Sequence, residues 1–316
     1  MAQLFLPRHY KAFAPGKELL NTPVIYQERL AVVDQFMWLH NQLKPHLKTR
    51  TEADGWDIHP HHQKQHIVSS WHHVWIDTSL SKRQRENKFA IEPDLEGTWK
   101  PIVREIGSMW LGYGKSKDQL NEAKMLIDND LDPDYKIHAD YANASYVHCR
   151  IQFYINHSTF RAWLVYTSKS VIDRGYFIRS IHDDASFRTK YWEAVQPLID
   201  QGFFYEAENS TLDFDSTLTK KDLFRFITKE VANKRAYSGI IREYTPDDPR
   251  LSTGNIAIEM TQNLDLLYPV YDLMVTRHIP GAQAAQPRNT PPDLTKLFGG
   301  VARNKNAQKK SKGGSK

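Results

Sequence analysis

The sequence predicts an α+β fold with a mixed, mostly antiparallel sheet, a central hairpin packed by helices, and a disordered basic tail. Three observations predict it. Residues 146–155 alternate apolar and polar side chains with period two, as a strand buried on one face does. Helical and strand patterns then alternate through residues 186–274, which is typical of helices packed on a sheet. Residues 301–316 have almost no apolar side chains.

The first half, residues 1–133, is predicted to contain a long helix that begins at Thr22-Pro23, an N-cap followed by proline. Apolar residues spaced three and four apart give it one broad buried face, and Pro45 is expected to end it. The other elements expected here are a turn at 51–55, a strand at 66–77, a helix at 100–106, a strand at 109–111 and a capped helix at 117–127.

A polar segment at 128–134 separates this half from the second, residues 134–279. The strand at 146–155 is expected to turn at 156–159 into a second strand at 160–167, which makes the central hairpin. The remaining strands are expected at 176–181, 203–207 and 237–244, and helices are expected to follow Ser186, to follow the Thr219–Asp222 capping box, and to span 256–274.

The net charge of the 316-residue chain, +5, is unevenly distributed. Residues 280–316 carry eight basic side chains and one acid, a net +7, which leaves −2 for the rest. The basic character therefore belongs to the tail, and the folded part offers no strong general attraction for nucleic acid. Within the tail, Leu294, Leu297 and Phe298 form a short apolar island, which suits a docking peptide for a protein partner or a strap on its own domain.

The polar side of the central hairpin is the candidate nucleic-acid surface. Cations alternate with aromatic rings there, the combination that contacts phosphates and stacks on bases. The alternative is the solvent side of a sheet, or a second packed face. The residues assigned to nucleic-acid binding are His148, Arg150, Tyr154, Arg161 and Trp163 of the hairpin, with Lys305, Lys309, Lys310 and Lys312 of the tail.

Histidines concentrate between His59 and His73, which holds six of the fourteen in the chain. Neutral imidazoles and carboxylates ligate transition metals, so His59, His61, His66 and Asp57 are the candidate ligands of a divalent metal. The segment has no HExxH or CxxC spacing, and surface or packed histidines are the alternative.

Two shorter patterns carry less information. Gly112-Tyr-Gly-Lys-Ser116 matches part of a phosphate-binding loop, and a glycine turn before a serine N-cap explains it equally. Asp134-Tyr-Lys136 matches part of a metal-dependent nuclease motif. The single cysteine, Cys149, falls on the apolar side of its strand and is expected to be a packed thiol.

Together these features predict a nucleic-acid-associated cytoplasmic protein, such as a bacterial DNA-processing or defence component, whose tail binds phosphates without sequence preference. A cytoplasmic location follows from the single cysteine and from the absence of an apolar membrane span or signal peptide. Two alternatives remain: a metal-dependent hydrolase that uses the His59–His73 cluster, and a non-enzymatic interaction module that docks through its tail.

Overall fold

The computed structural model describes residues 2–15, 23–60, 68–69, 92–93, 99–100, 107–116, 118–119, 148–167, 170–232 and 237–276. Helices and an antiparallel sheet make up these residues, which confirms the predicted α+β class. The tail at 280–316 and the boundary at 133/134 lie outside them, as do the helices expected at 100–106 and over most of 117–127.

The helices are α1 (Pro7–Lys11), α2 (Pro23–Asp54), α6 (Val171–Asp183), α7 (Ala185–Val195), α8 (Lys220–Phe226) and α9 (Ile256–Met274), with 3₁₀ turns at Gln196–Leu198 and Pro249–Leu251 and a π-helical turn at Ile227–Val231. The strands are β1 (His59–Pro60), β2 (Val68–Ser69), β3 (Glu92–Pro93), β4 (Trp99–Lys100), β5 (Ser108–Gly114), β6 (Arg150–Asn156), β7 (Phe160–Tyr166), β8 (Phe203–Ala207), β9 (Ser210–Asp213) and β10 (Ser238–Tyr244).

One sheet joins strands from both halves of the chain. Its order is β1-β5-β6-β7-β10-β8-β9, with β2 also paired to β5, and every described pairing is antiparallel. The predicted hairpin is confirmed as β6 and β7, which lie at the centre of the sheet. Asn156 fixes its loop, because its side-chain oxygen accepts the N–H groups of Ser158 and Thr159.

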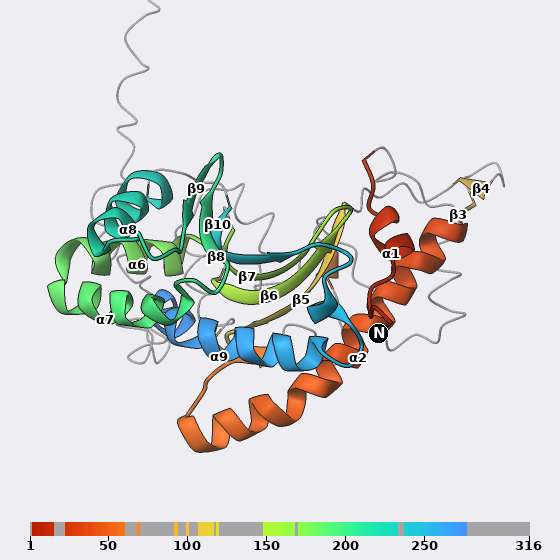
Figure 1. The fold of residues 1–316 in the computed structure, drawn as a ribbon, viewed down its shortest axis with the longest axis horizontal. Helices are drawn as coiled ribbons and strands as arrows, with labels where there is room; N and C mark the ends of the chain where they lie inside the picture. The colour runs from red at the N-terminus through yellow and green to blue at the C-terminus, as the bar shows by residue number, and fades with distance from the viewer. Residues whose placement is uncertain are drawn as a thin grey trace, which may run out of the picture.

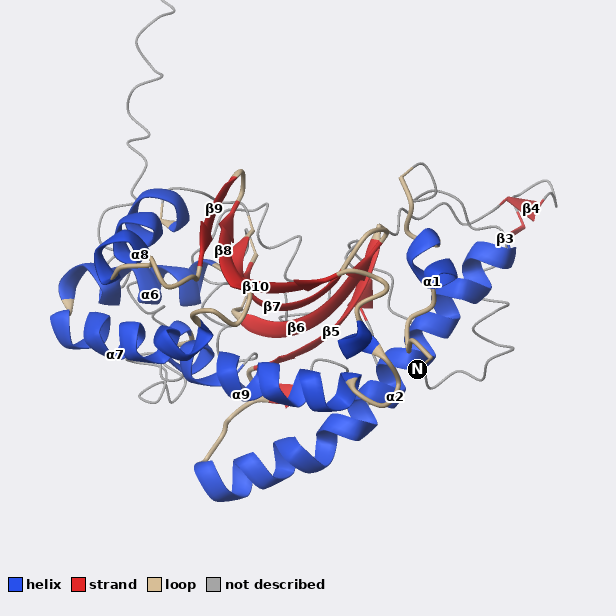
Figure 2. Ribbon diagram, viewed as in Figure 1, coloured by secondary structure: helices blue, strands red, loops and turns tan. Residues whose placement is uncertain are grey.

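The main core lies between the sheet and the long helices (Figure 1). Ile151, Phe153 and Ile155 of β6 alternate onto this face and are fully buried. Figure 2 shows the strands curving, with α9 and α2 on the convex side. The opposite, concave face carries the side chains of alternate register, so the sheet presents two chemically different surfaces. No helix among the described residues is long and apolar enough to cross a membrane.

The prediction that Pro45 ends the first long helix is wrong, as is the turn expected at 51–55. Helix α2 continues through Pro45 to Asp54, and Gly55, with a φ of +69°, follows its end. The expected apolar face is nevertheless confirmed, since Val32, Phe36 and Leu39 are fully buried. Packing of that face outweighs the backbone hydrogen bond that proline removes.

The strand expected at 176–181 is also wrong, because these residues belong to helix α6. Phe177 and Ile181 are buried four residues apart on one helical face, whereas Tyr176 is 39% exposed. A short run of aromatic and β-branched residues fits both periods, and here the helix buries its apolar pair. The strands at 203–207 and 237–244 and the helix at 256–274 are confirmed within a few residues, and the helix expected from Thr219 through Val231 is confirmed as α8 and the π-helical turn that follows it.

Candidate functional site

The concave face of the sheet is built around two tryptophans that lie against glycines. A Cβ atom at Gly112 would lie 2.6 Å from the ring of Trp110. A Cβ atom at Gly239 would overlap the Leu164 carbonyl oxygen and lie 2.8 Å from Trp163 Nε1. The two positions thus leave room for indole rings close to the strands, which a side chain would prevent.

Arg150 of β6 forms the centre of one half of this face. Its guanidinium lies 4.4 Å from the centre of the Trp110 ring, and its Nε donates a hydrogen bond of 3.0 Å to Gln152 Oε1. Arg150, Gln152 and Trp110 are all buried. The cation–π contact and the hydrogen bond hold the planar guanidinium in one orientation.

Arg161 of β7 has a different environment, because two glutamates neutralise its charge. Its guanidinium lies 2.6 Å from Glu243 of β10 and 3.7 Å from Glu206 of β8. The three side chains are partly exposed, so each pair contributes modestly to stability. A phosphate that approached Arg161 would compete with these carboxylates.

Aromatic and apolar side chains from four adjacent strands and the residue before β10 gather beside Arg161. We call this group the aromatic patch; it consists of Tyr154, Trp163, Phe204, Tyr237 and Ile241. Trp163 contacts Tyr154 edge-on at 5.7 Å and Tyr237 at 6.0 Å, both between ring centres. Trp163 is 7% exposed and its Nε1–H has no hydrogen-bond partner among the residues that the structure describes, whereas Tyr237 is 43% exposed. The patch therefore combines an exposed ring with a buried, unused donor.

A buried ionic centre lies at one end of the same strands. Asp173 of α6 accepts hydrogen bonds from Lys115 Nζ at 2.7 Å and from the backbone N–H groups of Cys149 and Thr276 at 2.9 Å each. His148 Nδ1 lies 3.3 Å from its other side, and the side chains of Lys115, His148 and Asp173 are at most 1% exposed. Burial raises the pKa of the Asp173 carboxyl, but Lys115 and His148 together outweigh burial and hold it well below its usual value.

His148 is held neutral in this centre. Burial lowers the pKa of its imidazole, Lys115 lowers it further, and Asp173 opposes both. Because a carboxylate only accepts, Nδ1 carries the proton toward Asp173, and the Nε2 lone pair has no partner among the described residues. This is the orientation of a general base, although the side chain is fully buried. The neighbouring Cys149 is fully buried, which confirms the expected packed thiol, and burial also raises its pKa.

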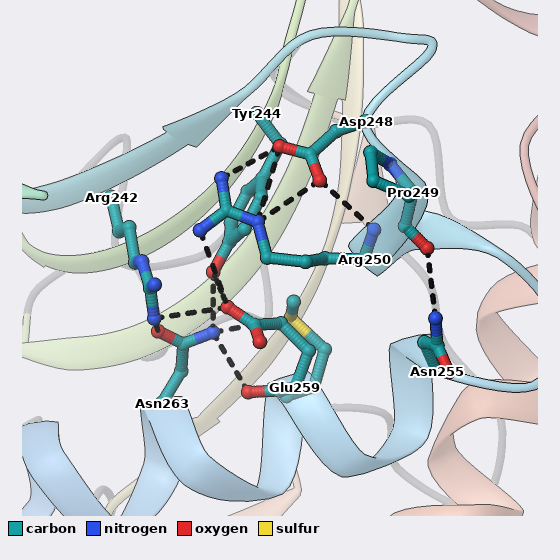
Figure 3. Close-up of polar contacts among 9 residues, drawn as sticks. Arg242, Tyr244, Asp248, Pro249, Arg250, Asn255, Glu259 and Asn263 are labelled. Atoms are coloured by element: carbon teal, nitrogen blue, oxygen red, sulfur yellow. Dashed lines mark hydrogen bonds and ion pairs between the residues drawn. The ribbon is translucent and has the colours of Figure 1, made fainter. Parts of the chain in front are cut away.

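A third polar cluster joins β10 to the start of α9 (Figure 3). Glu259 accepts a hydrogen bond from Tyr244 Oη at 2.8 Å and pairs with Arg242 at 2.9 Å, while Arg250 pairs with Asp248 at 2.6 Å. Two arginines thus face two carboxylates and cancel their charge. We interpret this cluster as a structural connection between β10, the Pro249–Leu251 turn and α9.

The structure places the predicted site residues in three groups. Arg150, Tyr154, Arg161 and Trp163 share the concave face, while His148 belongs to the ionic centre. Of the metal candidates, His59 Nε2 and Asp57 Oδ1 are 2.8 Å apart, and Gln119 Nε2 donates to Asp57 Oδ2 at 2.7 Å. The candidates outside the described residues are His61, His66, Lys305, Lys309, Lys310 and Lys312.

In the described parts of the chain no three His, Cys, Asp or Glu side chains gather closely enough to hold a metal ion. The partial phosphate-loop match is wrong for those residues, because Gly112 and Gly114 lie inside β5 and Lys115 is paired with Asp173. The capping box is confirmed instead, since Ser116 N–H donates to Gln119 Oε1 at 2.8 Å.

Sequence reasoning missed Lys115 and Asp173 as partners. They are 58 residues apart, and only the adjacency of the β5 end and the α6 start brings them together. The unusual position of Lys115 directly after a strand of aromatic and apolar residues was the one available signal. Neither a protein-family model nor a curated protein matches this sequence.

Proposed function

We propose that this chain is a nucleic-acid-associated protein of the cytoplasm. Its concave face contacts the bases of a single strand, and its Lys-rich tail attracts the phosphates. The observation that carries the proposal is the aromatic patch, in which Tyr237 is 43% exposed and Tyr154 and Phe204 are partly exposed around the buried Trp163. Exposed rings on a sheet stack on bases regardless of sequence.

The two parts would contribute differently to binding. Arg161 is paired with Glu206 and Glu243, so the concave face has little free positive charge of its own. The tail carries a net +7, and phosphate neutralisation by lysines makes affinity depend on salt. We therefore assign the salt-dependent part of the affinity to the tail and the salt-independent part to the aromatic patch.

Fluorescence anisotropy with a labelled single-stranded oligonucleotide tests this assignment across a salt series. Replacing Lys305, Lys309, Lys310 and Lys312 by Gln in the full chain should lower the slope of log affinity against log salt by up to about 3, because each single-strand phosphate contact contributes about 0.7. No binding by the unmodified chain at low salt, or an unchanged slope, would contradict the proposal.

The aromatic patch is tested with a matched pair of tyrosines. Tyr237→Ala should weaken binding about tenfold without changing the salt slope, because stacking on one base contributes about 1–3 kcal/mol. Tyr176→Ala on α6 is the control, since Tyr176 is similarly exposed at 39% and lies outside the patch. Equal losses in both variants would rule out a specific role for the patch.

A further inference from the structure

The apolar island of the tail, Leu294, Leu297 and Phe298, has no part in the function proposed above. We propose that this island docks on the aromatic patch of its own chain and covers the surface assigned to bases. Docking itself requires no nucleic acid. Its consequence, competition between tail and nucleic acid, rests on the proposed function.

The chemistry of the patch fits such an occupant. Trp163 and Ile241 form its buried floor, and Tyr154 and Phe204 are half-buried around them. Leu294, Leu297 and Phe298 would share one face of a single helical turn and could bury that face on the rings.

The charges around the patch favour a basic segment. Glu206 and Glu243 flank it and are 28% and 35% exposed, and within the described part of the chain both pair with the same cation, Arg161. The island contains Lys296 and continues into a lysine-rich sequence, and the remainder of the chain carries −2 against the +7 of the tail. A basic segment close to these carboxylates is electrostatically complementary.

The chain leaves the described fold at the end of the β7–β10 pair that carries Tyr237, since Tyr166, which pairs with Ser238, donates its hydroxyl to the Met274 carbonyl oxygen. Thr276, the last described residue, donates its N–H to Asp173. Arg174, the residue after Asp173, donates from its guanidinium to Thr167 O at 3.1 Å and to Ser238 Oγ at 3.5 Å. Ser238 directly follows Tyr237 of the patch. Seventeen residues separate Thr276 from Leu294, enough for about 55 Å of extended chain. A tether of this length gives an effective concentration in the millimolar range, so a weak contact suffices.

Nitrogen-15 NMR of the indole N–H groups tests the docking in the full chain, which has eight tryptophans. The Trp163 signal is identified as the one that moves most in Tyr237→Ala. The triple variant Leu294→Ala, Leu297→Ala, Phe298→Ala should shift this signal and accelerate its exchange with water. The matched control is Val301→Ala, an apolar tail residue outside the island, which should leave the spectrum unchanged. A Trp163 signal that is identical in the triple variant and the unmodified chain overturns the proposal.

Dilution separates docking within one chain from docking between two copies. A Trp163 shift that persists over a hundredfold dilution supports the intramolecular contact, and a shift that disappears on dilution overturns it. In the oligonucleotide assay the triple variant should bind about threefold to tenfold more tightly. If the NMR shift is present but no oligonucleotide binds, docking stands and the proposed function fails. If oligonucleotide binds and the NMR shift is absent, docking fails and the proposed function stands.

Discussion

At the scale of single residues, two glycines determine the shape of the concave face. Gly239 is the stricter position, because a Cβ atom there would overlap the Leu164 carbonyl oxygen of the neighbouring strand as well as approach Trp163. A backbone carbonyl within a sheet cannot move without disturbing its ladder. The sequence predicts that Trp163 and Arg150 lie on the same face of the hairpin, but it does not show which glycine lies beneath the indole ring.

Gly239→Ala should therefore lower the free energy of unfolding by about 2–4 kcal/mol, since steric overlap in a packed core costs about 1–3 kcal/mol and here the sheet backbone must also shift. Urea denaturation followed by circular dichroism measures the change. Gly107→Ala serves as the control, because no atom lies within 4 Å of a Cβ at that position. Comparable stability of the two variants would show that the strand accommodates the methyl group.

At the scale of elements, side-chain periodicity predicted most helices and strands, and the errors share one physical cause. Alternation identified β6, and the spacing of buried residues identified α9. The errors at Pro45 and at 176–181 arose where a local signal opposed burial: a proline within a long amphipathic helix, and a β-branched and aromatic run whose members also fit a helical face. Tertiary packing decided both, and no local pattern contains that information.

Helix α2 offers a test of how far tertiary packing outweighs an unfavourable local residue. Pro45 is exposed and lies inside the helix, where proline removes a backbone hydrogen bond and strains the preceding turn. Pro45→Ala should raise the free energy of unfolding by about 1–2 kcal/mol. Alanine is the better helix former, and part of that gain is lost because the unfolded chain without proline has more conformational entropy. Thermal unfolding measures the effect, with Pro269→Ala in α9 as the second exposed helical proline. Destabilisation by Pro45→Ala would mean that the core requires a bend at this point.

At the scale of the whole molecule, Asp173 joins four segments that are distant in the sequence: the end of β5, the start of β6, helix α6 and Thr276, two residues after the end of α9. Breaking a buried ion pair by removing one partner leaves an uncompensated charge and costs about 3–5 kcal/mol. Asp173→Asn should destabilise the fold by this amount, measured by urea denaturation. The double variant Asp173→Asn, Lys115→Met removes both charges and should recover much of the loss. A double variant that is no more stable than the single one would argue against this electrostatic explanation.

The same centre predicts how stability depends on pH. Burial lowers the pKa of His148, and burial also lowers that of His9, whose Nδ1 accepts the Leu6 N–H. Below about pH 6.5 these two histidines bind protons in the unfolded chain while staying neutral in the folded one, so the free energy of unfolding falls as the pH falls. Each contributes a slope of at most about 1.4 kcal/mol per pH unit. Between pH 7.5 and 5 the low pKa of Asp173 keeps its carboxylate ionised, so that group adds nothing to the slope.

His148→Gln should therefore flatten the dependence of unfolding free energy on pH between 7.5 and 5, and His148→Gln with His9→Gln should flatten it further. His182→Gln is the control, because the His182 side chain is 80% exposed and pairs only with Asp183 among the described residues. Urea denaturation at four pH values gives the slopes. If His148→Gln leaves the slope unchanged, His148 binds protons equally in the folded and the unfolded chain. The neutral imidazole assigned to the ionic centre would then be wrong.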